Sequence, residues 1–301
     1  MVLKSFEEIH DKVRSATAVR TVVLVRAEDE HSQEAIFQVE KDGLLKAIFV
    51  GNREAIKATA AKLGHEISDD RIYDAEDPNS AAALGVQLIR EGKGDFLMKG
   101  KLETGELLKA VVNKETGLSK GGVMNHMAVN QVPAYHKLLV TCDGGMLTYP
   151  TLEQKASIIE NVVDALHKLG YEDPKVCVLA CAEKVNPKMP ETIEAAALKE
   201  MNQTGHITGC TIEGPISLDL ALVKERSVVK GYESPCAGDA DVLLVPNIHA
   251  GNILGKSLVE MAGAKMAGLI LGAKCPIVLT SRGSSAEEKY NSLILACATC
   301  E

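Results

Sequence analysis

Short β-branched runs alternate with amphipathic helical patterns along nearly the whole chain, and this alternation limits the possible folds more than any other feature. In the first helical pattern, for example, Phe6, Ile9 and Val13 share one face. Alternating strands and helices pack as parallel sheets with helices on both faces, and ligands bind where the strands end. We therefore predict an α/β protein with strands at residues 20–25, 46–50, 95–98, 124–132, 138–142, 175–179, 207–212, 241–245, 268–271 and 276–280.

The alternation is interrupted by a glycine-rich stretch between residues 117 and 150. This stretch is typical of an antiparallel excursion or of a crossover between domains. A chain of 301 residues is about two domains long, at ~100–200 residues per domain. We therefore expect two lobes that meet at a cleft, with their border in this stretch.

Composition excludes several classes of protein. Hydrophobic residues make up 46% of the chain and charged residues 25%, which is typical of a folded domain and not of a disordered one. The formal charge of -8 repels nucleic-acid backbones, and a chain without Trp and with four Phe has little material for stacking bases. We expect no nucleic-acid partner.

Nothing in the sequence predicts a membrane segment. Apolar runs stay well below the ~18–20 residues that span a bilayer, and the first residues, MVLKSFEEIH, lack the apolar core of a signal peptide. We therefore expect a cytoplasmic protein without a membrane partner.

The eight cysteines predict neither a disulfide framework nor a metal centre. Most lie inside apolar segments, where a thiol acts as a small buried side chain. Cys297 and Cys300 form a single CxxC without a second ligand pair at a matching distance, so we expect no metal site and place both on a C-terminal helix.

The segment AGNILGKS, residues 250–257, is close to a phosphate-binding P-loop, with Ala250 where the first glycine should be. A helix that begins at about Gly251 and Asn252 would present free backbone N–H groups to an anion. The alternative is an ordinary strand-to-helix turn whose glycines allow close packing. His249 is either a site residue or a hydrogen-bonding residue at the helix entry.

A second candidate is TSRGSSAEEK, residues 280–289, where an apolar strand ends in Ser281 and Arg282. A hydroxyl and a guanidinium group at one strand end are suited to a phosphoryl group. Helix capping is the alternative role for this segment, because the spacing of Ser284 to Glu287 and of Ser285 to Glu288 fits a capping box.

Two further candidates carry weaker signals. LMKGKLET, residues 97–104, places Lys99, Gly100 and Thr104 after a strand, where they either bind phosphate or lie in a solvated loop. His126 is flanked by apolar residues, so it is either a site residue or a core histidine with its hydrogen bonds satisfied.

Together these segments resemble the phosphate acyltransferases, the family of phosphate acetyl- and butyryltransferases, and most of all its butyryl-transferring branch. The similarity extends over nearly the whole chain. It is carried by the three motifs above together with IEGPISLDLAL at residues 212–222 and VNPKMPETIEAAAL at residues 185–198.

The resemblance implies a two-lobed fold of three α/β/α layers, similar to isocitrate and isopropylmalate dehydrogenases, with the active site in the cleft between the lobes. It implies a first domain of residues 1–130 plus 275–301, a second of residues 131–274, and a homodimer or higher homo-oligomer. The reaction it implies is acyl-CoA + phosphate = acyl phosphate + CoA. The CoA thioester and inorganic phosphate are then the partners, with no tightly bound cofactor and no metal.

The resemblance also implies roles for individual residues. Ser281 and Arg282 correspond to the pair that binds phosphate and the acyl carbonyl in acetyl-transferring relatives, and Glu288 stands where those relatives have an aspartate proposed as the base. The turn that binds substrate corresponds to Asn247, Gly251 and Asn252, with His249 inside it. Lys99 lies where the butyryl branch has its Met-Lys-Gly.

The pKa values of the reacting groups indicate which of these roles contributes more to catalysis. Full proton transfer from a thiol of pKa ~8.5 to a carboxylate of ~4.3 is uphill by about 6 kcal/mol. A capped helix start beside Arg282 would lower the pKa of Glu288 and widen this gap. We therefore expect Arg282 and the helix start at Asn252 to stabilise the developing charges, with base catalysis contributing less.

Three other functions remain open. A phosphate acetyltransferase specific for acetyl-CoA would use the same residues. An oxidoreductase of related fold would need a dinucleotide motif and clustered aspartates, and the sequence has neither. A non-catalytic protein that binds phosphate or a nucleotide is the third, because Glu288 departs from the family's aspartate.

Overall fold

Parallel strands and the helices that connect them make up most of the chain, which confirms the predicted α/β class. The structure, a computed structural model, describes residues 2–280 and 283–300. The chain divides into a terminal unit, residues 7–122 and 267–301, and a central unit, residues 1–6 and 123–266. Each unit is described separately below.

The terminal unit begins with helix α1 (Phe6–Arg14), whose first residue belongs to the central unit. Strands and helices then alternate as far as α5, and the consecutive strands β10 and β11 and helix α11 complete the unit. Its strands lie in the order β3-β2-β1-β4-β11-β10, all parallel except β10. The elements are β1 (Arg20–Val25), α2 (Glu30–Lys41), β2 (Leu45–Gly51), α3 (Arg53–Lys62), β3 (Ile72–Asp74), α4 (Pro78–Arg90), β4 (Phe96–Lys99), α5 (Thr104–Val111), β10 (Lys265–Leu271), β11 (Ile277–Val278) and α11 (Ala286–Thr299).

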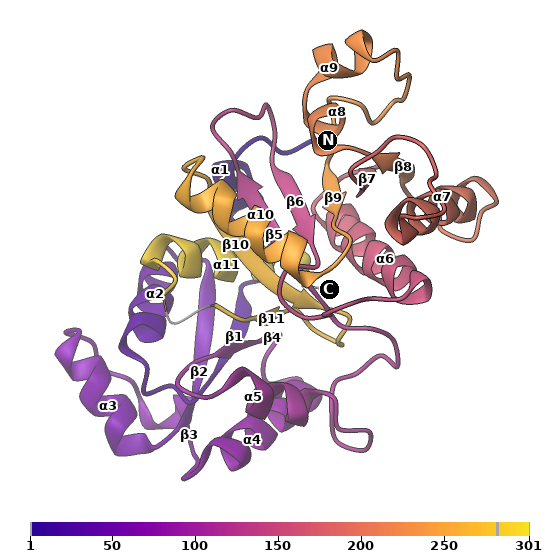
Figure 1. The fold of residues 1–301 in the computed structure, drawn as a ribbon. Helices are drawn as coiled ribbons and strands as arrows, with labels where there is room; N and C mark the ends of the chain where they lie inside the picture. The colour runs from indigo at the N-terminus through magenta and orange to yellow at the C-terminus, as the bar shows by residue number, and fades with distance from the viewer. Residues whose placement is uncertain (1, 281–282, 301) are drawn as a thin grey trace. The chain divides into compact units, whose positions relative to one another are not determined.

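Helices cover both faces of these strands. Helices α2 and α11 pack against each other, α4 packs against α5, and the two pairs lie on opposite sides of β1 and β4 (Figure 1). This arrangement follows from the strand order, in which β2 and β3 lie on one side of β1 and β4 lies on the other. Right-handed connections in these two opposite directions place their helices on opposite faces of the strands. Strand β1 reads RTVVLV and is buried over its last four residues, as expected for a strand covered on both faces.

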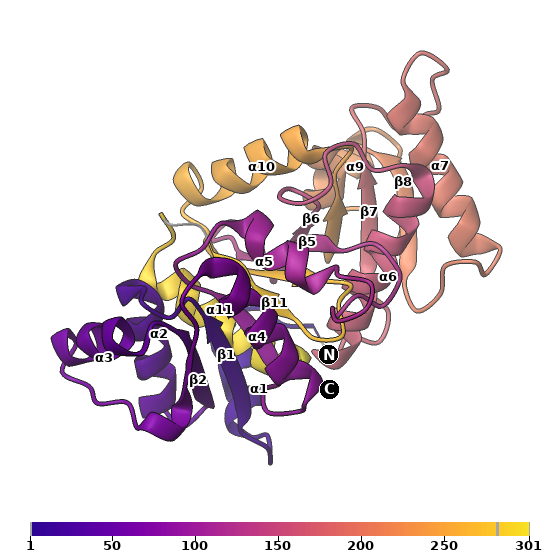
Figure 2. The same ribbon diagram turned by 90° about the horizontal axis from the view of Figure 1, so that it is seen from below.

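The central unit has strand order β5-β6-β9-β7-β8, with β5 antiparallel to β6 and the others parallel. Helix α6 lies on one side of these strands and α10 on the other (Figure 2). The elements are β5 (Asn125–Gln131), β6 (Leu139–Cys142), α6 (Leu152–Lys168), β7 (Lys175–Leu179), α7 (Pro190–Gln203), β8 (Thr211–Ile216), α8 (Leu218–Leu222), α9 (Lys224–Val229), β9 (Val242–Leu244) and α10 (Ile248–Glu260).

The glycine-rich stretch contains the antiparallel pair β5 and β6, which confirms one of its two interpretations. The units divide after residues 122 and 266, whereas the expected domain borders follow residues 130 and 274. The first six residues belong to the central unit, where Leu3 accepts a hydrogen bond from the N–H of Leu138 (2.9 Å).

One expected strand begins later than the sequence predicts, and a glycine turn follows α10. The strand expected at residues 207–212 begins only at Thr211, because Gly209 takes a φ of +76° and Asn202 Nδ2 binds the carbonyl groups of Ile207 and Cys210. Helix α10 ends at Glu260, and Gly263, with φ +64°, turns the chain into β10.

Candidate active site

A cavity of about 830 Å³ lies in the terminal unit where β1, β4 and β11 end. The three strands are parallel neighbours, with Val25 paired to Lys99 and Val278 paired to Met98, so their carboxyl ends meet at one edge. Ligands bind at this edge in open α/β sheets. This lysine cavity is lined by Glu28, Asp29, Glu30, His31, Ser32, Ala55, Thr59, Lys62, Pro78, Lys99, Gly100, Lys101, Leu102, Glu103, Glu106, Thr280 and Lys289.

Lys99 and Gly100 lie together in this lining, at the end of β4. The Lys99 side chain is buried, and its Nζ donates to the carbonyl oxygen atoms of Leu102 (3.1 Å) and Gly100 (3.3 Å). A Cβ on Gly100 would collide with the carbonyl oxygen of Arg26, so this close approach of two strand ends requires glycine. A phosphate-binding role for the two residues stays a prediction.

Thr104 is placed differently from Lys99. It is the first residue of α5 and is exposed, while its neighbours Glu103 and Glu106 line the lysine cavity. Glu106 Oε2 accepts a hydrogen bond from the Glu103 N–H (2.9 Å) and so caps the helix. The position of Thr104 favours the solvated-loop interpretation.

Ser281 and Arg282 lie outside the described residues, but the segments on either side of them reach the lysine cavity. Thr280 precedes them and Lys289 follows them, and both side chains are buried in the cavity lining. The Nζ of Lys289 donates to Thr280 Oγ1 at 2.9 Å.

Glu288 belongs to the first turn of α11 and is half-buried. Ser285 caps this helix by accepting the Glu288 N–H (3.1 Å), and the Glu288 carboxylate accepts a hydrogen bond from Ser284 Oγ (2.6 Å). Burial raises the pKa of Glu288 above its ordinary value of 4.5, against the lowering effects of Ser284 and Lys289. The expectation of a lowered pKa is therefore wrong, because removal of the carboxylate from water outweighs these favourable contacts.

In the central unit, the loop after β6 is organised by Asp143. Its buried carboxylate accepts hydrogen bonds from the N–H groups of Gly145 (2.8 Å), Met146 (2.8 Å), Leu147 (3.1 Å) and His126 (3.2 Å). Four charge-assisted bonds to backbone donors hold the loop in one conformation.

The start of α10 lies earlier than the sequence predicts. The helix begins at Ile248, and Asn247 Oδ1 accepts the N–H groups of His249 (3.1 Å) and Ala250 (3.2 Å). The N–H of Ile248 donates to Thr148 (3.1 Å), and that of Gly251 to the Asn247 carbonyl (3.1 Å). The prediction of free backbone N–H groups at Gly251 and Asn252 is therefore wrong, because residues of this chain already cap the first turn of the helix.

Gly251 serves close packing instead. A Cβ at this position would lie 2.7 Å from the Cα of Gly144 and 2.8 Å from the Asp143 carbonyl oxygen. Asn252, one position further along, is exposed, and its side-chain amide lies 3.5 Å from the Gly144 carbonyl. Both predicted residues therefore lie against the Asp143 loop.

The two predicted histidines also lie beside this loop. His126 is partly buried on β5, and burial lowers the pKa of its imidazole while Asp143 opposes the shift. His249 is exposed on α10, with Nε2 3.0 Å from the hydroxyl of Tyr149. The predicted residues that the structure describes thus form two groups: Lys99, Gly100, Thr104 and Glu288 in the terminal unit, and His126, Asn247, His249, Gly251 and Asn252 in the central unit.

A second cavity, of about 570 Å³, belongs to the central unit and is mainly apolar. It lies beyond the carboxyl ends of β7 and β9, and the predicted residue Asn247 is part of its lining. Leu179, Ala180, Cys181, Met189, Glu191, Thr192, Ser217, Leu218, Val245, Pro246, Asn247, Ala250 and Leu254 line this apolar cavity.

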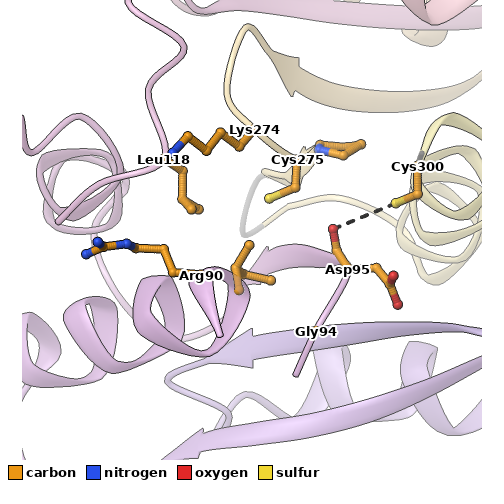
Figure 3. A pocket seen from close by; sticks show the side chains of 9 residues that line it. Arg90, Gly94, Asp95, Leu118, Lys274, Cys275 and Cys300 are labelled. Atoms are coloured by element: carbon orange, nitrogen blue, oxygen red, sulfur yellow. Dashed lines mark hydrogen bonds between the residues drawn. The ribbon is translucent and has the colours of Figure 1, made fainter. Parts of the chain in front are cut away.

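A third cavity, of about 360 Å³, lies at the opposite edge of the terminal unit, where β4 and β11 begin (Figure 3). Cys300 Sγ points to the carbonyl oxygen of Asp95 (3.9 Å), whereas Cys297 Sγ points to that of Leu44 (4.0 Å). Burial raises the pKa of Cys297 to about 12. The CxxC thiols thus have different backbone partners, and only Cys297 lies within α11, since Cys300 follows its last residue.

Within residues 2–280 and 283–300, no group of three or more His, Cys, Asp or Glu side chains is arranged to hold a metal ion. Among the helices of these residues, none is both long and apolar enough to cross a membrane.

Two side chains that the sequence did not single out are Asp143 and Lys289. A lysine in the first turn of a helix opposes the helix dipole. The position of Lys289 in SSAEEK could therefore have indicated a functional residue from the sequence. For Asp143 the signal was the DGG that follows a buried strand, since an aspartate there commonly binds the N–H groups of a turn.

Comparison with known proteins defines the class of this chain. A family model described as "Phosphate acetyl/butaryl transferase" matches residues 75–297. The phosphate butyryltransferase of Clostridium acetobutylicum is 40% identical over 98% of both chains, and the phosphate acetyltransferase of Thermotoga maritima is 42% identical over 92% of this chain and 94% of the other. The chain therefore belongs to the phosphate acetyl/butyryl transferase family of enzymes.

A solved structure supports the same assignment. The branched-chain phosphotransacylase from Enterococcus faecalis V583 superposes with a TM-score of 0.81 at 31% identity, covering 93% of this chain and 99% of that one. The fold and the family resemblance predicted from sequence are confirmed.

Proposed function

We propose that this enzyme transfers a butyryl or similar short acyl group between CoA and inorganic phosphate. A phosphate oxygen attacks the thioester carbonyl, a tetrahedral oxyanion forms, and its collapse releases the CoA thiolate and leaves an acyl phosphate. In the opposite direction the thiol loses its proton as it attacks the acyl phosphate. The similarity to a phosphate butyryltransferase over 98% of both chains carries this proposal.

The described residues support this chemistry in both units. Buried Lys99 and Lys289 supply positive charge where parallel strands end, which suits a phosphate substrate. The apolar cavity of the central unit has aliphatic walls without an aromatic ring, which suits an acyl chain.

Three residues are proposed to act on the reacting atoms. Ser281 and Arg282 bind the phosphate and the acyl carbonyl, as the family motif implies. Glu288 removes the thiol proton, because burial raises the pKa of its carboxyl group and so narrows the gap to the thiol pKa. This proposal replaces the expectation from sequence that base catalysis contributes less than charge stabilisation. Asn247, Gly251, Asn252, His126 and His249 are proposed to bind or shape the site for the CoA thioester.

The basic test is thiol release from butyryl-CoA, followed with a thiol reagent. Release should occur only when phosphate is present and should yield an acyl phosphate that hydroxylamine traps. Release without phosphate would indicate hydrolysis of the thioester and contradict the transferase. No release with any acyl-CoA would favour a non-catalytic binding protein.

Chain length distinguishes butyryl from acetyl transfer, which the two curated relatives leave as alternatives. Each buried methylene contributes ~0.8 kcal/mol, so two further methylenes should raise kcat/KM for butyryl-CoA about tenfold over acetyl-CoA. A series of acetyl-, propionyl-, butyryl- and isovaleryl-CoA measures this preference. An optimum at acetyl-CoA would instead support a phosphate acetyltransferase.

We also propose that the enzyme is at least a homodimer. Helix α10 exposes 67% of Ile253, and Met261 just beyond it is 84% exposed, so a second copy would remove this apolar surface from water. Sedimentation at micromolar concentration should give a mass well above the 32.1 kDa of one chain. A mass near that value would contradict the dimer.

Compartment and cofactor complete the proposal. All eight cysteines are free, which favours a reducing compartment, and we place the enzyme in the cytoplasm. We propose no tightly bound cofactor, since CoA and phosphate are both substrates.

A further inference from the structure

The lysine cavity contains two charged side chains that are almost completely withdrawn from solvent. Lys99 is 9% exposed and Lys289 is 4% exposed, and both line the same cavity. Lysine is rarely buried to this extent unless an anion or several acceptors surround its ammonium group.

Their positions on the fold bring the two lysines to one edge. The parallel register pairs Val278 with Met98, so Lys99, one residue beyond Met98, and Thr280, two residues beyond Val278, both lie at the carboxyl ends of adjacent strands. Lys289 reaches the same place from α11, where its Nζ lies 2.9 Å from Thr280 Oγ1. The three side chains come from three segments of the terminal unit.

The helix dipole and burial both disfavour a charged lysine at position 289. It stands in the first turn of α11, where a cation opposes the helix dipole, and its burial lowers its pKa. A buried methionine or leucine would avoid both costs. A cation at this position adds positive charge to the cavity, which suits an anionic ligand.

The carboxylates in the same lining have their own partners. Glu28 binds Arg26 (3.2 Å) and the N–H of Asn52 (2.9 Å), and Asp29 caps α2 by accepting the N–H of Ser32 (3.0 Å). Glu103 and Glu106 cap α5, and Glu30 is exposed at the start of α2. Asp29 and Glu288 are the carboxylates that act electrostatically on Lys289.

We propose that Lys99, Thr280 and Lys289 form a phosphate-binding site at the ends of β4 and β11. Thr280 Oγ1 accepts from Lys289 and keeps its own hydroxyl hydrogen to donate, and the two buried ammonium groups add positive charge that suits a phosphate oxygen. The site rests on the proposed function for its ligand: either inorganic phosphate or a phosphate group of CoA.

Lys289→Met is the direct test. Loss of a charged hydrogen bond should raise KM about 10- to 50-fold for one phosphate-bearing substrate, with a smaller change in kcat. Measuring KM for inorganic phosphate in one direction and for CoA in the other identifies the source of the phosphate group. Lys289→Arg, which keeps the charge, should recover part of the loss, and Lys114→Met, at an exposed lysine of the terminal unit outside this lining, should leave both KM values unchanged.

A second measurement does not depend on activity. Phosphate or CoA should raise the melting temperature of the wild-type protein relative to chloride at equal ionic strength, and Lys289→Met should lose most of that increase. Thr280→Val, a near-isosteric change, serves if Lys289→Met does not fold, and it should show the same loss in weaker form.

The outcomes separate the site from the function. Wild-type KM values and an unchanged thermal shift in the variants would overturn the site while leaving the transferase intact. A Lys289-dependent thermal shift in a protein that releases no thiol from any acyl-CoA would support the site and overturn the proposed reaction.

Discussion

Glu288→Gln is expected to lower kcat/KM by ~10²–10⁴-fold, the usual contribution of a general base. The Ser284 hydroxyl donates to the carboxylate at 2.6 Å, and a glutamine carbonyl can accept the same bond, so the change removes basicity more than shape. Burial raises the pKa of Glu288, which moves the carboxylate toward the thiol pKa and makes it a more effective base at neutral pH. Initial rates with butyryl phosphate and CoA measure the loss.

The pH profile gives an independent reading of the same role. The ionised form is the base, so the wild-type rate should rise with pH through the pKa of Glu288, at higher pH than for an ordinary carboxyl group of pKa 4.5. Glu288→Gln should lack this acidic limb. Glu287→Gln, at the exposed neighbour in the same helical turn, is the matched control and should keep both the rate and the limb.

Stability distinguishes lost chemistry from lost folding. A carboxyl group whose pKa is raised in the folded state contributes stability below the unfolded pKa, and that contribution disappears as pH rises through the folded pKa. Glutamine has no charge to bury, so Glu288→Gln should melt no lower than the wild type at neutral pH. If the folded Glu288→Gln variant loses tenfold or less in kcat/KM, Glu288 is not the general base and its role is helix capping alone.

Arg282→Ala is expected to lower kcat/KM by a few hundredfold, equivalent to ~3–4 kcal/mol of transition-state stabilisation. The family motif assigns this guanidinium group to the phosphate and the acyl carbonyl, where negative charge develops. Arg282→Lys should recover only part, because an ammonium group cannot make two parallel hydrogen bonds to one phosphate.

Two controls accompany the arginine variants. Arg90→Ala removes an exposed arginine that lines the cavity at the opposite edge of the terminal unit and should leave kcat/KM unchanged. Guanidinium ion added to Arg282→Ala should restore part of the rate. Activity within about tenfold of wild type in Arg282→Ala would contradict the assignment.

Buried strands were the part of the fold that sequence predicted best. The bounds of β1 and β7 agree with their predicted ranges, because a strand covered on both faces needs a continuous β-branched run that few other structures tolerate. Strand β3, three residues at an edge of the terminal unit, has no such run and was missed. The start of α10 was misplaced because Asn247 caps it four residues before the predicted glycine.

The sequence by itself determined the α/β class, the family, and the motifs that supply Lys99, Gly100, Arg282 and Glu288, since these depend on local periodicity and on residue order. Only the tertiary structure decided which charges are withdrawn from water. The raised pKa of Glu288 and the burial of Lys289 both arise from packing against segments distant in the chain, such as Lys289 beside the cap of α2 at Asp29. Desolvation depends on every neighbouring atom in space, so residue order alone does not determine it.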